Sequence, residues 1–114
     1  DLGNVLEESG DYTGAQSAYR HTLHLAFELN DQQAIGESLL ALGRMLMNDT
    51  PQLNRVVQLL EEAVERLPDN VEARRLLSRA KTRQERLTNA GVTLMLPEEN
   101  IRAYASASMD ESGG

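Results

Sequence analysis

Apolar side chains recur at steps of three and four residues through most of the chain, and short polar turns interrupt them. Steps of this size place side chains on one face of an α-helix. They predict helices over residues 2–9, 12–29, 33–47, 51–67 and 71–87. The side chains expected to be buried along these stripes are Leu2, Leu6, Tyr12, Ala15, Tyr19, Leu23, Leu39, Leu42, Leu46, Leu53, Val56, Leu60, Ala63, Leu67, Leu76 and Leu77.

The turns between these segments carry residues that start or stop helices. Gly10 suits the position after a helix, where a left-handed backbone is common, and Asp31 can cap the helix that follows it. Thr50 is placed as the capping residue of the fourth helix, with Pro51 as its first helical residue. Gly36 and Gly43 lie inside the third helix, where each costs about 1 kcal/mol relative to Ala, so we expect another backbone to approach there.

After Gly91 the character of the chain changes, which divides it into a helical domain (1–91) and a C-terminal tail (92–114). Pro97 is expected to open a helix of two turns over residues 100–107, and the polar residues 106–114 are expected to fray. The tail is too apolar for an unattached linker. It can fold back over an open face of the helices, fill their groove, or dock on a neighbouring chain.

One pattern occurs twice. Leu2-Gly3 returns as Leu42-Gly43, so the two glycines are 40 residues apart. A period of this size is typical of helical-repeat proteins, in which each unit buries its apolar stripe against its neighbours.

Residues 2–19 contain Leu2-Gly3, then Gly10-Asp11-Tyr12 at the turn, then Ala15 and Tyr19. This pattern resembles the tetratricopeptide repeat, a helix–turn–helix unit, and its longer period is similar to the repeats of kinesin light chains and G-protein-signalling modulators. The resemblance extends over residues 1–87.

The later units depart from the pattern. The second keeps Ala63 and Pro68, has Val56 and Leu60 where Ala and an aromatic are commoner, and holds one extra residue at its turn. In the third unit Ser78 replaces the glycine. Residues 71–87 are therefore either the first helix of a third unit or the solvating end helix that such arrays require.

The resemblance implies an all-α, helix–turn–helix repeat solenoid of about five helices plus a tail, whose concave groove binds a peptide segment of another protein. The first helix of each unit lines that groove in this family. The matching positions proposed to bind a partner are Asn4, Glu8, Glu37, Leu40, Arg44, Met47, Glu72, Arg75 and Arg79, with Glu7, Asn48 and Arg83 beside them. The alternative is that these exposed charges only keep the helices solvated. The carboxylate clamp of some family members is not matched, because Ala41, Glu72 and Leu76 stand where Asn, Lys and Arg are expected.

Charge and composition exclude several classes of function. The 114 residues carry a formal net charge of −7, which argues against general nucleic-acid binding. The charge is uneven: residues 1–50 hold eight acids and two bases, whereas residues 51–90 hold six acids and eight bases. There is no cysteine and no apolar run long enough to span a membrane. The chain begins at Asp1 within a helical pattern, so we expect a fragment of a longer array. We also expect the protein to be cytoplasmic.

No motif for catalysis or for a cofactor is present, so we expect a protein that is not an enzyme. His21, His24 and Glu28 form only a weak metal-site pattern on one helix. Arg75, Arg79 and Arg86 share a helix face that can recognise acidic groups. The alternatives to peptide binding are a structural segment that self-associates and a regulatory domain with a small-ligand or metal site.

Overall fold

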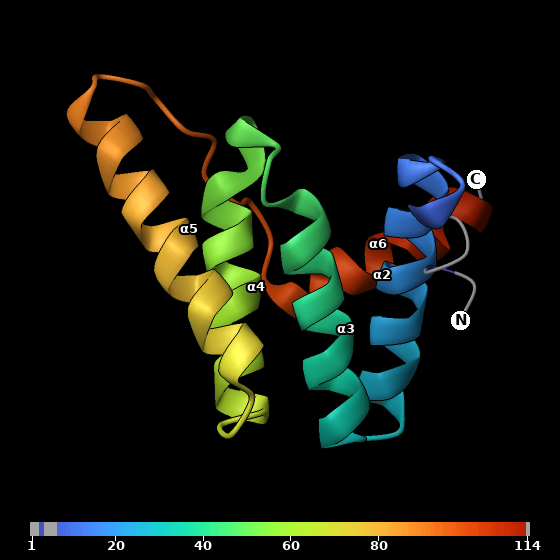
Figure 1. Cartoon of the computed structure of the whole chain (residues 1–114). Coiled ribbons are helices and arrows are strands. Elements are labelled where there is room, and N and C mark those ends of the chain that lie inside the picture. The colour runs from blue at the N-terminus through green and yellow to red at the C-terminus, as the bar shows by residue number, and fades with distance from the viewer. Residues whose placement is uncertain (1–2, 4–6, 114) are drawn as a thin grey trace.

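Amphipathic helices pack side by side in the order of the chain, each joined to the next by a short turn (Figure 1). They are α2 (Tyr12–Glu28), α3 (Gln32–Leu46), α4 (Leu53–Arg66) and α5 (Val71–Asn89), and a further helix, α6 (Ile101–Gly113), lies in the tail. The predicted helices over residues 12–87 are therefore confirmed to within a few residues at their ends.

This computed structural model describes residues 3 and 7–113, with 108–113 described by backbone alone. The described residues are all-α and contain no strand. None of the described helices combines the length and apolar character needed to cross a bilayer. Leu2, Asn4 and Leu6, which the sequence assigned to the core or to the binding face, lie outside the described residues.

Short polar side chains define where the helices begin. The Asp11, Asp31 and Asn70 side chains accept hydrogen bonds from the backbone N–H three residues further on, at 2.9, 3.1 and 2.9 Å. Each bond satisfies a donor that has no partner within the helix. Gly10 has a φ of +89° at the preceding turn, which is the left-handed geometry expected of it.

The turn before α4 differs from the prediction. Thr50 does not cap α4, because Thr50–Gln52 form a short 3₁₀ helix and α4 begins only at Leu53. Pro51 fits this first turn because its missing N–H has no bond to make there. The extra residue of the second unit is taken up here, before the α-helix starts.

The core is aliphatic and follows the predicted stripes. The predicted residues that are buried are Ala15, Tyr19, Leu23, Leu39, Leu42, Leu46, Leu53, Val56, Leu60, Ala63, Leu67 and Leu76. The assignment of Tyr12 is wrong, since this side chain is 62% exposed at the first residue of α2. Leu77 is only partly buried and packs against the edge of the core.

Two glycines occupy equivalent places in the two units. A Cβ on Gly3 would lie 2.8 Å from Tyr19 Cε1, and a Cβ on Gly43 would lie 2.6 Å from Leu60 Cδ2. Tyr19 of α2 is therefore seated on Gly3, and Leu60 of α4 is seated on Gly43 of α3. The expected close approach is real, but the approaching group is a side chain and not a backbone.

The end of the helical domain is polar on its outer side. Ser78, which stands where the other units have glycine, is exposed, as are Arg74 and Glu85. No described helix packs on that side, so α5 needs no glycine at this place. Of the two interpretations of this helix, the solvating end helix fits the structure better.

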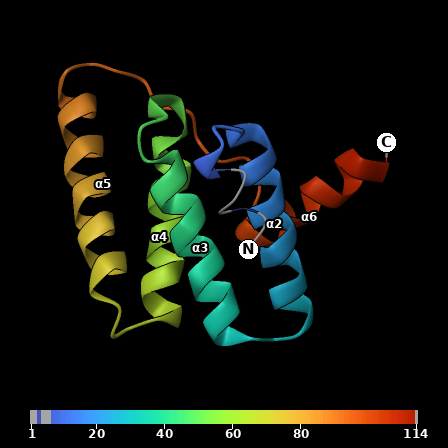
Figure 2. The ribbon, with the colours of Figure 1, turned by 45° about the vertical axis from the view of Figure 1, so that its right-hand side comes forward.

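The tail folds back over the helices, as one of the three alternatives proposed. Helix α6 packs against α2 on the side of the domain away from α5, as Figure 2 shows. It begins at Ile101, within one residue of the predicted start, because the Asn100 side chain caps it by accepting a 2.8 Å bond from the Ala103 N–H. It continues to Gly113, so the expectation that the helix ends near residue 107 is wrong.

Replacing Gly43 with Ala tests the importance of the glycine seat. The added methyl would meet Leu60, and overpacking of this kind costs about 1–3 kcal/mol. Ala also raises helix propensity by about 1 kcal/mol relative to Gly. We expect a net loss in the free energy of unfolding, measured by urea denaturation, that shrinks when Leu60 is changed to Ala in the same chain.

Ser78→Ala, at the corresponding exposed place on α5, is the matched control and should change stability by no more than about 0.5 kcal/mol. A Gly43→Ala variant as stable as the wild type would contradict the role of the seat.

Candidate functional site

The residues predicted to bind a partner fall into two groups. Glu8, Glu37, Glu72, Arg75 and Arg79 are exposed, as is Arg44. Leu40 and Met47 are buried instead, at 7% and 6% exposure, because they belong to the core that α3 shares with its neighbours. These two side chains offer no accessible apolar surface, and the candidate site is consequently polar throughout its described part.

An ion pair connects two of the predicted site residues across the face formed by α3 and α5, here called the α3–α5 face. Arg44 Nη1 lies 3.3 Å from Glu72 Oε1, and both side chains are about half exposed, at 45% and 52%. A second acid, Glu37, accepts a 2.9 Å hydrogen bond from Gln33 on the same helix. The α3–α5 face therefore brings together acids and bases from two units.

Tyr19 joins this face to the first unit. Its hydroxyl donates a 3.2 Å hydrogen bond to Glu7 Oε1. Burial raises the pKa of Tyr19, the Glu7 carboxylate raises it further, and Arg44 opposes both effects. Arg44 is thus close enough to influence Tyr19 on one side while it pairs with Glu72 on the other.

Arg83 has a structural role. Its guanidinium donates hydrogen bonds to the Met47 carbonyl at 3.0 Å and to the Thr50 hydroxyl at 2.9 Å, and it lies 3.4 Å from Asn48 Oδ1. These contacts hold the turn after α3 against α5. The sequence placed Arg83 and Asn48 beside the binding residues, but the described contacts use them to fasten this turn.

The remaining arginines of this side of α5 have no partners. Arg75, Arg79 and Arg86 are exposed and make no ion pair or hydrogen bond with any residue that the structure describes. A hollow of about 390 Å³ lies among Arg79, Thr82, Arg83, Arg86 and Leu87. The α3–α5 face therefore ends in a row of available guanidinium groups.

The opposite side of the domain carries a cluster that the sequence did not single out. Tyr104 of α6 is only 4% exposed and contacts two guanidinium groups, with Arg20 of α2 and Arg55 of α4 each 4.4 Å from its ring centroid. Gln16 Nε2 donates a 2.9 Å hydrogen bond to the tyrosine hydroxyl, and Arg20 Nε donates a 3.0 Å bond to the Tyr104 carbonyl. We call this place the α2–α4 groove.

Arg55 is a buried cation in this groove, at 6% exposure. It donates hydrogen bonds to the Glu99 carbonyl at 2.9 Å and to Gln58 Oε1 at 2.6 Å, and it pairs with the Glu99 carboxylate at 3.2 Å. Burial lowers the pKa of Arg55, and Glu99 opposes that shift. The one available sequence signal was a lone arginine among the apolar residues of α4, between Leu53 and Val56.

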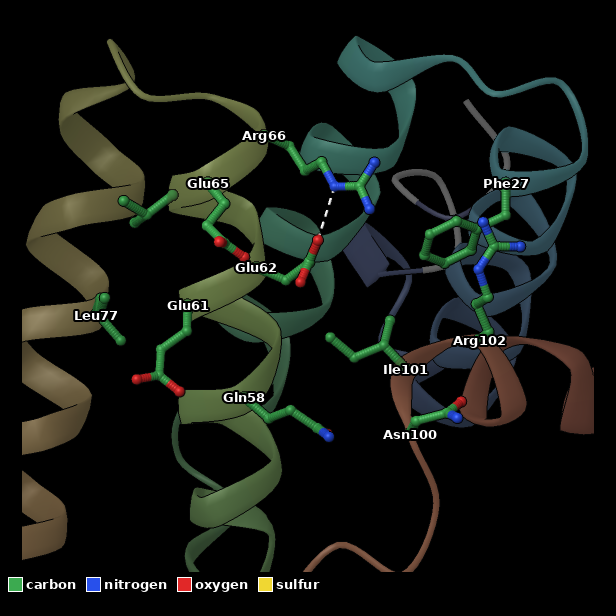
Figure 3. Close-up of a pocket in the computed structure, with 11 residues that line it drawn as sticks. Phe27, Gln58, Glu61, Glu62, Glu65, Arg66, Leu77, Asn100, Ile101 and Arg102 are labelled. Atoms are coloured by element: carbon green, nitrogen blue, oxygen red, sulfur yellow. Dashed lines mark hydrogen bonds and ion pairs between the residues drawn. The ribbon is translucent and has the colours of Figure 1, made fainter.

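A shallow hollow of about 770 Å³ lies next to the groove, between α4, α5 and the start of α6 (Figure 3). Three acids of α4, Glu61, Glu62 and Glu65, point toward it, while Ile101 and Leu77 supply apolar walls. Glu62 pairs with Arg66 at 2.7 Å and Glu61 pairs with Lys81 at 3.5 Å. Two of the three carboxylates are therefore engaged, in agreement with a solvated helix face.

The weak metal-site pattern does not assemble into a cluster. Within the described part of the chain no three side chains suited to a metal gather in one place. His24 Nε2 lies 3.8 Å from Glu28, while its Nδ1 faces the Ser106 hydroxyl of the tail at 3.4 Å. His24 thus takes part in docking α6, and His21 is exposed on α2.

No protein-family model, curated protein or solved structure matches this chain.

The buried tyrosines predict how stability changes at alkaline pH. Burial raises the pKa of Tyr19 and of Tyr104, so the unfolded chain loses these protons first as the pH rises above about 10. The contribution of these two tyrosines to the free energy of unfolding should therefore be constant below that pH and fall above it. Tyr19→Phe should reduce the loss of stability at alkaline pH, and the double variant with Tyr104→Phe should reduce it further.

The measurement is urea denaturation at a series of pH values. At neutral pH Tyr19→Phe should cost about 0.5–1.5 kcal/mol through the lost hydrogen bond to Glu7, and this difference should narrow as the wild type is destabilised. If the free energy of unfolding fell equally with pH in the wild type and in Tyr19→Phe across the alkaline range, Tyr19 would not be a source of the alkaline loss of stability.

Proposed function

We propose that this chain is a protein-recognition module of the tetratricopeptide type, not an enzyme, and that it binds a peptide segment along the α3–α5 face. The observation that carries the proposal is the row of arginines on α5, Arg75, Arg79 and Arg86, which are exposed and have no partners among the described residues. Guanidinium groups with unused donors are suited to carboxylates, which they bind through two parallel hydrogen bonds.

The charges on the face favour a peptide of mixed sign. The arginine row attracts acidic side chains at the α5 end, while Glu37 on α3 favours a basic side chain nearer the first unit. Complementary charges of this kind set the direction in which a peptide lies and speed its association. The peptide is expected to supply an acidic stretch and, a few residues away, a lysine or arginine.

The Arg44–Glu72 pair stands in the middle of the face, where an incoming peptide would meet it. An exposed pair of this kind is worth only about 0–1 kcal/mol. A carboxylate of the ligand can therefore replace Glu72 as the partner of Arg44 at little cost. This exchange gives the face a way to accept a ligand without a change in backbone.

The alternative of self-association through exposed apolar ends finds less support. The outer side of α5 is polar, with Arg74, Ser78 and Glu85 exposed. A further unit stacking there would have to bury these groups. Arrays use such polar faces to end the stack.

The proposal is tested by selecting peptides from a displayed library on the immobilised full-length chain and measuring their affinities by calorimetry. The selected peptides should be acidic at one end, and Arg79→Glu should weaken their binding by at least about tenfold through the reversed charge. Arg44→Glu should weaken it as well.

Arg74→Glu is the matched control, because Arg74 is an exposed arginine of the same helix that lies outside the α3–α5 face. It should leave affinity nearly unchanged. Equal losses from Arg74→Glu and Arg79→Glu, or a library that yields no binding peptide, would contradict the proposal.

A further inference from the structure

We propose that the α2–α4 groove is a second binding site, distinct from the α3–α5 face, for a segment that carries a glutamate just before a helix and a tyrosine five residues later, in the first turn of that helix. The chain's own tail occupies the site as a tethered ligand through Glu99 and Tyr104. A partner protein that presents the same pair of side chains displaces the tail, which then becomes exposed to solvent.

The contacts of Tyr104 have the chemistry of ligand recognition. The Arg20 and Arg55 guanidinium carbons each lie over its ring, 4.4 Å from the ring centroid, so the ring contacts two cations. Cation–π contacts of this kind strengthen when they are shielded from water. Gln16 at the same time fixes the hydroxyl at 2.9 Å. An aliphatic side chain in this position would lose the ring contacts and the hydrogen bond together.

The groove is built to require an acid as well. Arg55 is 6% exposed with the tail in place, and Glu99 provides its carboxylate partner together with a backbone carbonyl. Gln58, on the same helix as Arg55, is the partner that remains when the tail leaves. A buried cation without its counter-charge is strongly unfavourable, so a ligand that restores a carboxylate at this place is preferred over one that does not.

The connection of the tail to the domain is that of a tether. Residues 92–98 have no regular structure, and Met95 and Leu96 are 64% and 78% exposed. The Met95 carbonyl accepts a 2.9 Å hydrogen bond from Asn54. Such a segment can detach without disturbing α2 to α5, whose core consists mainly of their own side chains.

The length of the tether decides between the two possible competitors, a partner and a second copy of the chain. A short flexible linker holds its own segment at an effective concentration of the order of millimolar. A second copy at micromolar concentration therefore competes poorly with the chain's own tail. A partner displaces the tail when the partner's segment binds the groove more tightly than the tail does. The apparent affinity of the partner is its intrinsic affinity multiplied by the fraction of chains in which the tail has left the groove.

The test uses the full-length chain and a fluorescent synthetic peptide with the sequence of residues 94–107 as the probe, with binding followed by anisotropy. Tyr104→Ala in the chain removes the ring that competes for the groove, so this variant should bind the probe at least about tenfold more tightly than the wild type. A probe in which Tyr104 is itself replaced by Ala should not bind. Met95→Ala, at an exposed position of the tether, is the matched control and should bind the probe as the wild type does.

Two further variants locate the binding. Added to Tyr104→Ala, Arg55→Gln should abolish probe binding, whereas Arg79→Glu should leave it unchanged, because Arg79 belongs to the α3–α5 face. Failure of this site is thereby distinguished from failure of the proposed function. If circular dichroism shows that Tyr104→Ala has lost helix, Glu99→Gln replaces it and should give a smaller gain in affinity.

Three outcomes would overturn the inference. The first is a folded Tyr104→Ala or Glu99→Gln chain that binds the probe no better than the wild type. The second is a loss of probe binding with Arg79→Glu. The third is a wild-type chain whose mass doubles with concentration in sedimentation, because the occupant of the groove would then be the tail of a second copy.

Discussion

The seating of one large side chain on one glycine determines how the helices of each unit pack. Tyr19 rests on Gly3 and Leu60 rests on Gly43, at places where even a methyl group would collide. Helices α3 and α4 approach closely at Gly43 because this position has no side chain. The stripes of leucine, valine and alanine then meet across the gap, and the surrounding core supplies most of the favourable free energy through burial of apolar surface.

This packing leaves the domain with two polar sides, one with exposed arginines and one with a buried arginine. On the α3–α5 face the arginines of α5 remain exposed and hydrated, so they stay available to an outside group. In the α2–α4 groove an arginine is removed from water and is neutralised by a segment of the same chain. The first arrangement leaves charges for recognition, and the second uses them to hold the tail.

The sequence predicted the helices and most of the core because both depend on local periodicity. The three- and four-residue steps locate Leu23, Leu42 and Leu60 without reference to distant contacts. Tyr12 was assigned to the core by its place in the repeat pattern, but a residue at the first position of a helix has no preceding turn to cover it.

The candidate sites were predicted less completely, because they depend on which distant side chains meet. The repeat pattern placed Leu40 and Met47 on the binding face. They are buried instead, because neighbouring helices that the pattern does not specify cover them. The pairing of Arg55 with Glu99 joins residues 44 positions apart, and no periodic pattern signals a contact of that separation. Tyr104 belongs to the tail that the sequence marked only as apolar, because a sequence does not reveal which arginines contact its ring.

The 3₁₀ turn at Thr50–Gln52 has a consequence for how such chains diverge. It absorbs one additional residue, and Leu60 still reaches Gly43 as Tyr19 reaches Gly3. The length of a connecting turn and the fit between the helices are therefore independent properties. Insertions can accumulate in the turns of one unit while its neighbours keep their stacking, and the spacing of a repeat can drift over evolution long before its architecture is lost.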